Sequence, residues 1–159
     1  MTDWTIEQFE NAVKEAIEEK FNKEKTARET FEKLKEDLLS ACKKFANDTE
    51  EYWNAYCNLM TQKISYSCQP TSSERFDMKS IGALIINRRN GEVHFAVNQR
   101  IHEWNSVTLL NIVIKGDEVA SIFNDNLTAN DLETLCKVIG NENFKNNYLD
   151  RLVNSIKED

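Results

Sequence analysis

Apolar residues recur every three or four positions through most of residues 5–46, which is the spacing of one face of an α-helix. Thr5 begins the pattern, and Thr5 with Gln8 matches the capping box that satisfies backbone N–H groups in a first helical turn. Because no glycine or proline interrupts this range, we predict one continuous helix, with a break near Asn22 as the alternative. The apolar positions are Ile6, Phe9, Val13, Ile17, Phe21, Phe31, Leu34, Leu38, Ala41, Cys42 and Phe45.

Asn47 and Asp48 are predicted to end this helix and to begin a second one, because Asp48 and Glu51 match another capping box. A connection this short returns the chain antiparallel to the first helix, so we predict that residues 1–64 form a long helical hairpin. Residues 65–80 contain the only proline of the chain and many small polar residues. We predict that this stretch is a linker loop.

Two β-hairpins are predicted over residues 81–127. The first turns at Asn90-Gly91, which is a strong hairpin signal, so that Arg89 pairs with Glu92. The second turns at Gly116 and the aspartate that follows it. Together they predict an antiparallel sheet of about four strands. Both faces of the second hairpin are largely apolar, so we expect helices to cover the sheet on both sides.

The last part of the chain, residues 128–159, is predicted to form two C-terminal helices. Thr128 is placed to cap the first of them, Gly140 to end it, and the second runs over about 142–157. A chain of 159 residues fits one domain. The predicted fold is therefore a single α+β domain.

The charge and composition of the chain indicate which classes of partner and which cellular compartment to expect. The chain has 20 basic and 27 acidic side chains, a formal net charge of −7, which makes nucleic acid an unfavourable partner and suits a basic protein. The first 20 residues are too acidic for a signal peptide, and no apolar run is long enough to span a membrane. We therefore expect a cytoplasmic protein. Its four cysteines match no zinc or redox motif; we expect Cys42, Cys57 and Cys136 to be reduced, and Cys68 to be exposed.

Catalytic motifs are missing from the sequence. It has two histidines and four glycines, with no nucleophile elbow and no glycine-rich phosphate loop. His94 and His102 would lie about 26 Å apart along a straight strand, too far to share a metal ion. We predict no enzyme, no cofactor and no metal site.

One face of the first hairpin is a candidate ligand site. Amide, imidazole and guanidinium groups would stand there above an apolar floor and could bind a small nucleotide-like anion. The alternative is a solvated rim. The candidate ligand-binding residues are Asn87, Arg88, His94, Asn98 and Arg100.

Protein partners have their own candidate residues. Trp104 lies in the connection between the two hairpins and could anchor a partner, and Arg89 lies at a hairpin tip. Phe9 and Phe21 belong to a helical stripe that would pack within the helical hairpin or, as the alternative, form a homodimer.

The sequence favours a non-enzymatic binding protein that neutralises or regulates a macromolecular partner, as inhibitors, immunity proteins and phage counter-defence proteins do. The alternative is a protein that binds or sequesters a small anion on the hairpin face around His94. An enzyme using His94 or His102 ranks third.

Overall fold

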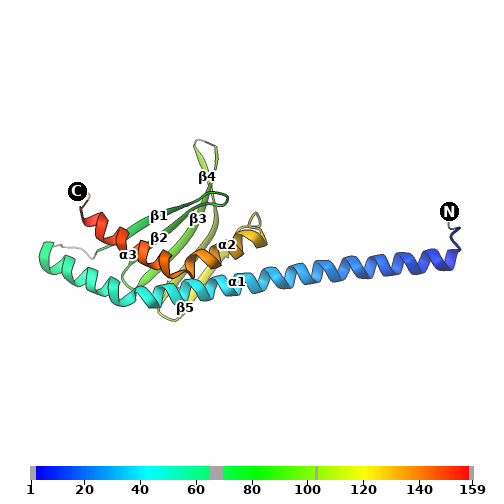
Figure 1. Ribbon diagram of the computed structural model, residues 1–159, viewed down its shortest axis with the longest axis horizontal. Coiled ribbons are helices and arrows are strands. Elements are labelled where there is room, and N and C mark those ends of the chain that lie inside the picture. Colours follow the sequence, from blue (N-terminus) through cyan, green and yellow to red (C-terminus); the bar gives the residue numbers. More distant parts are fainter. Residues whose placement is uncertain (1–2, 65–69, 103, 158–159) are drawn as a thin grey trace.

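The computed structural model describes residues 3–64, 70–102 and 104–157. Within these residues, one antiparallel sheet of five strands packs against three helices, which confirms the predicted α+β class. Figure 1 shows the elements in chain order. Their bounds are α1 (Ile6–Ile64), β1 (Ser72–Met78), β2 (Gly82–Arg89), β3 (Glu92–His102), β4 (Asn105–Lys115), β5 (Glu118–Phe123), α2 (Ala129–Ile139) and α3 (Glu142–Lys157).

α1 is one helix of 59 residues, so the predicted helical hairpin is wrong, and so is the alternative break near Asn22. At 1.5 Å per residue it is about 88 Å long. Asn and Asp cost only a fraction of a kcal/mol inside a helix, and an ion pair of 2.9 Å between Lys44 Nζ and Asp48 Oδ2 stabilises the helical form. The buried face of α1 also continues on the same side of the helix through Phe45 and Trp53. Burial of these side chains stabilises an unbroken helix over a turn.

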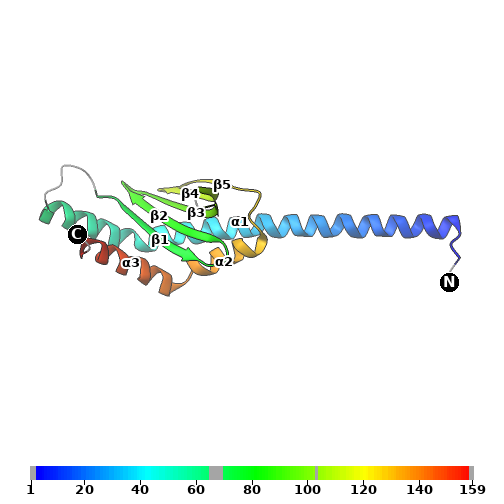
Figure 2. The same cartoon turned by 90° about the horizontal axis from the view of Figure 1, so that it is seen from above.

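The N-terminal part of α1 extends away from the rest of the molecule (Figures 1 and 2). We call residues 3–30 the arm. Apart from the half-buried Ala12, every residue of the arm is exposed, and Phe31 is the first residue of α1 that packs on the core. Thr5 and Gln8 form the predicted capping box, with N–H to side-chain distances of 3.1 and 3.2 Å.

β1 lies where a linker loop was predicted. Its residues alternate between the helix side and the solvent side, but only Phe76 and Met78 are apolar, so the pattern was too polar to read as a strand. Backbone pairing with β2 stabilises β1 as a strand, although most of its side chains are polar. The predicted linker is therefore shorter, and Cys68 within it lies outside the described residues.

The two predicted turns and their registers are confirmed. Asn90 and Gly91 both have positive φ, 46° and 79°, and Arg89 pairs with Glu92. Lys115 pairs with Glu118 around the second turn. The strands follow one another in space in chain order, as a meander.

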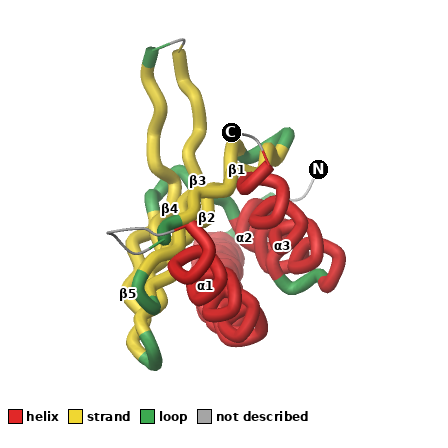
Figure 3. The backbone as a smooth tube through the Cα atoms, turned by 90° about the vertical axis from the view of Figure 1, so that its left-hand side faces the viewer, coloured by secondary structure: helices red, strands yellow, loops and turns green. Residues whose placement is uncertain are grey.

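The helices lie on one side of the sheet, not on both (Figures 2 and 3). Core side chains of the central strands, such as Leu84, Phe95 and Ile112, point to that side and are fully buried. In the part of the chain that the structure describes, no helix covers the opposite face, which we call the outer face. Ile122 on β5 consequently keeps 74% of its surface exposed. The prediction that helices cover both faces of the sheet, which rested on the apolar residues of β4 and β5, is therefore wrong.

The two C-terminal helices are confirmed. Thr128 caps α2 in a reciprocal capping box with Asp131. Gly140 ends α2, although with an ordinary helical φ of −79°. Phe144 and Tyr148 of α3 pack around Phe45 of α1, and Phe45 also packs on Phe95 of β3, so these rings join α1 and α3 to the sheet.

Candidate functional site

A hollow on the sheet gathers some of the predicted ligand residues. It has a volume of about 340 Å³ and lies where β1, β2 and β3 meet. Asn87 and His94 face each other across β2 and β3, as predicted. The residues that line it are Thr71, Ser72, Ser73, Asn87, Arg88, Arg89 and His94.

The charge of this hollow is mixed. His94 Nε2 lies 3.0 Å from Glu92 Oε2, and Lys115 Nζ lies 3.7 Å from the other oxygen of the same carboxylate. The hydrogen bond from His94 and the charge of Lys115 hold the pKa of Glu92 below its ordinary value. An anion in the hollow would therefore meet a carboxylate that is already ionised.

Arg88 is directed elsewhere. Its side chain is 3% exposed and donates hydrogen bonds to Thr49 Oγ1 and, at 3.0 Å, to the carbonyl oxygen of Ala46, both in α1. Its guanidinium also lies 5.8 Å from the centre of the Trp53 ring. Desolvation by burial lowers the pKa of Arg88. The strand alternation that puts Leu84 in the core puts Arg88 on the same face, a signal that sequence reasoning missed.

Asn98 and Arg100 do not join the hollow. They follow His94 on β3 by four and six residues, which is about 13 and about 20 Å of strand. Asn98 Oδ1 instead accepts a hydrogen bond of 3.1 Å from the Thr108 hydroxyl. Of the five candidate ligand residues, Asn87, Arg88 and His94 line the hollow, with Arg89 beside them, but the guanidinium of Arg88 is bound to α1.

A projecting hairpin presents Trp104. β3 and β4 extend together beyond the other strands (Figures 1 and 3). Trp104, at their tip, keeps 91% of its surface exposed, the largest fraction for any large apolar side chain in the described residues, and Ile101 keeps 54%. The pairing skips Leu109 between Val97 and Asn98, a β-bulge where the projection begins.

The arm carries a second exposed apolar surface. We call its apolar side chains the arm stripe; they expose between 40% and 76% of their surface. They include Phe9 and Phe21, the two candidates from the sequence. Trp4 packs edge-on against Phe9, with ring centres 6.2 Å apart. The members of the arm stripe are Trp4, Ile6, Phe9, Val13, Ile17 and Phe21.

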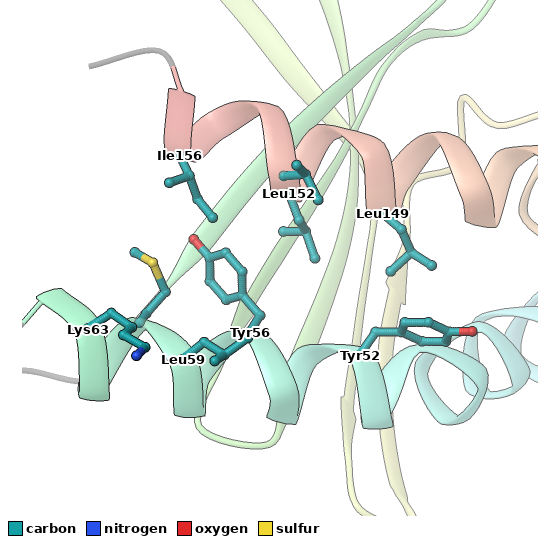
Figure 4. Close-up of a pocket in the computed structure, with 9 residues that line it drawn as sticks. Tyr52, Tyr56, Leu59, Lys63, Leu149, Leu152 and Ile156 are labelled. Carbon is teal, nitrogen blue, oxygen red and sulfur yellow. The ribbon is translucent and has the colours of Figure 1, made fainter.

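A groove between α1 and α3 was not predicted. It has a volume of about 400 Å³, and side chains from the two helices point toward each other across it (Figure 4). Among the described residues, Lys63 is the one charged side chain that lines the groove, so the groove suits apolar groups. The groove depends on the position of α3 beside Tyr52 and Tyr56 of α1, which is a tertiary feature. The other lining residues are Leu59, Met60, Leu149, Leu152, Val153 and Ile156.

Among the described residues, no three His, Cys, Asp or Glu side chains are grouped so that they could hold a metal ion. Cys42, Cys57 and Cys136 are unpaired thiols, and burial raises the pKa of each. None of the described helices has the length and apolarity needed to cross a membrane. The side chain of His102 lies outside the described part of the chain.

Comparisons with protein-family models, with curated proteins and with solved structures found no match to this chain.

Proposed function

We propose that this chain is a non-enzymatic binding protein that neutralises or regulates a protein partner, and that it holds the partner through the β3–β4 hairpin. The single observation that carries the proposal is the exposure of Trp104 at the tip of a projecting hairpin. A tryptophan left in water forfeits a large hydrophobic stabilisation, and tryptophan is enriched at the centres of protein interfaces.

The hairpin suits insertion into a pocket of the partner. Ile101 lies beside the tip and adds a second exposed apolar side chain. The strands are held by backbone pairing as far as His102 and Asn105, so the tip is carried on an ordered ribbon. Pre-ordered anchors lose less conformational entropy on binding.

The charge of the chain indicates the kind of partner. A formal net charge of −7 speeds the approach of a basic protein and repels polyanions. Apolar contact at the tip then supplies most of the affinity. A tryptophan anchor of this kind contributes about 2–4 kcal/mol to binding.

Photo-cross-linking in the cells that make the protein tests the proposal. Benzoylphenylalanine placed at Trp104 should capture one protein of defined mass, and the same group at Asp117, on the exposed turn between β4 and β5, should not. With the captured partner purified, Trp104→Ala should weaken binding by about 30-fold or more. Unchanged affinity of Trp104→Ala, or capture of nothing at position 104, would refute the proposal.

The hollow on the sheet favours a second candidate function, the binding of a small anion. Arg89 would supply positive charge, His94 an imidazole ring and Asn87 an amide. Thermal denaturation in the presence of a nucleotide panel would show a rise in midpoint that Arg89→Ala abolishes and Arg100→Ala does not. Equal effects of the two substitutions would exclude this hollow.

A further inference from the structure

We propose that the arm is a dimerisation element, and that the arm stripe of one chain packs antiparallel against the arm stripe of a second copy. This goes beyond the function proposed for the hairpin and does not depend on it. Four properties of the arm support it: the direction of the stripe, its spacing, its charge and its length.

The arm stripe forms one continuous face. At 3.6 residues per turn, Ile6 lies ten turns before Cys42, a fully buried residue of α1, and so points to the same side of the helix. The other helical members of the stripe lie within about 60° of that direction, because they recur at intervals of three or four residues. The arm therefore repeats the surface that the rest of α1 buries against its own core, but none of the residues that the structure describes covers it.

The spacing of the stripe is self-complementary. If two antiparallel arms align so that facing positions add up to 30, Phe9 of each copy faces Phe21 of the other. Val13 of each copy faces Ile17 of the other. Ile6 faces Glu24, at the end of the apolar contact. Each large apolar side chain between positions 9 and 21 thus meets an apolar partner, as in helix pairs with interlocking side chains.

Charge favours the antiparallel arrangement. Residues 3–10 carry Asp3, Glu7 and Glu10 and no basic group, a formal charge of −3. Residues 20–27 carry three lysines and one glutamate, a formal charge of +2. In the same register these two segments face each other twice, once at each end of the pair. A parallel pair would place the acidic segments side by side, where like charges repel.

The length of the arm fits this register. Residue 3 of one copy faces residue 27 of the other, so the paired segments 3–27 lie outside the core of the other copy, which begins at Phe31. At 150–200 Å² per large side chain, the exposed fractions of the stripe add up to about 500–700 Å² per copy and about 1,000–1,400 Å² for the pair. That area lies at the low end for specific interfaces, and we expect a weak dimer that dissociates in the micromolar range. The dimer would carry two β3–β4 hairpins, one on each core.

Sedimentation velocity of the full chain tests the dimer. From about 1 to about 200 µM, the wild type should shift toward twice the 18.5 kDa mass of one chain. The variant Phe9→Glu/Ile17→Glu should weaken association at least 100-fold. Its matched control, Asn11→Glu/Asn22→Glu, adds the same charge on the opposite side of the helix and should still form dimers. Both variants should keep the thermal midpoint of the core, since the arm contributes no buried side chain to it.

Disulfide trapping tests the antiparallel register. In a chain whose native cysteines are replaced by alanine, Ile6→Cys/Glu24→Cys should give dimers linked from position 6 to position 24. The two positions lie about 27 Å apart within one helix, so this bond cannot form inside a chain. Peptide mapping that finds links only between identical positions would contradict the antiparallel register. A wild type that stays monomeric at about 200 µM, or a control that dissociates as fully as the stripe variant, would overturn the dimer. A monomer that still binds a partner through Trp104 would leave the proposed function standing.

Discussion

Gly82 is where one added methyl group should perturb the β3–β4 hairpin most. Its φ is +137°, a backbone conformation that residues other than glycine rarely adopt. A Cβ atom at this position would overlap the carbonyl oxygen of Asn98 and would lie 3.0 Å from the Asn98 carbonyl carbon and 3.1 Å from Cα of Gln99. These are backbone atoms next to the bulge from which the hairpin projects, so no side-chain rotation relieves the contact.

The cost of Gly82→Ala can be estimated from these contacts. The backbone conformation contributes about 1–2 kcal/mol. Moving β3 away from the methyl group contributes a further 1–3 kcal/mol, by analogy with overpacked cores. We expect a loss of about 2–5 kcal/mol in the free energy of unfolding, or roughly 10 °C in the thermal midpoint of a chain this size.

Gly116→Ala is the matched control. Gly116 also has positive φ, 61°, but a Cβ there meets no atom within 4 Å, so only the conformational cost of about 1 kcal/mol applies. Urea denaturation of both variants, followed by far-UV circular dichroism, gives the two free energies. If Gly82→Ala were no more destabilising than Gly116→Ala, the close approach of β2 to the bulge would be wrong.

Three further predictions concern stability. Arg88→Ala should lower the free energy of unfolding by about 2–4 kcal/mol. Arg88→Met should stay within about 1 kcal/mol of the wild type, because methionine refills the volume and needs no hydrogen bonds. Equal losses of the two variants in urea denaturation would contradict this. Burial raises the pKa of the Cys42 thiol, so this thiol stays protonated in the native state but loses its proton in the unfolded chain above about pH 8.5. The free energy of unfolding should therefore fall as pH rises through that value. Urea denaturation at about pH 7 and about pH 10 should show a smaller fall in Cys42→Ala, and an identical fall would show that this thiol does not contribute. Thr128→Ala removes the hydroxyl that accepts a hydrogen bond from the Asp131 backbone N–H at the start of α2, and should cost about 1 kcal/mol in thermal denaturation. Thr128→Ser should restore most of this loss, and no loss on Thr128→Ala would mean that the cap does not stabilise the helix.

Local features were predictable because their physics spans only a few residues. The capping boxes at Thr5 and Thr128 follow from side chains that reach backbone groups three residues away. The turn at Asn90-Gly91 follows from two residues that accept positive φ, and it sets the register of β2 against β3. The same register placed Asn87 opposite His94 correctly.

Features that depend on what lies against a surface were not predictable in this way. Asp48 resembled the start of a helix, but packing of α1 on the core stabilises an unbroken helix more than a local cap would stabilise a new one. β1 exists because β2 offers an edge for its backbone, not because its own side chains are apolar. The groove of Figure 4 exists because α3 lies alongside α1.

The candidate binding residues divide in the same way. The sequence by itself determined that Phe9, Phe21 and Trp104 are large apolar groups on a helix and in a hairpin connection, since periodicity alone places them there. Only the tertiary structure decided that all three stay in water while Arg88 is buried. The reason is that exposure is set by the position of other elements: the core begins at Phe31, the sheet ends before Trp104, and α1 covers Arg88.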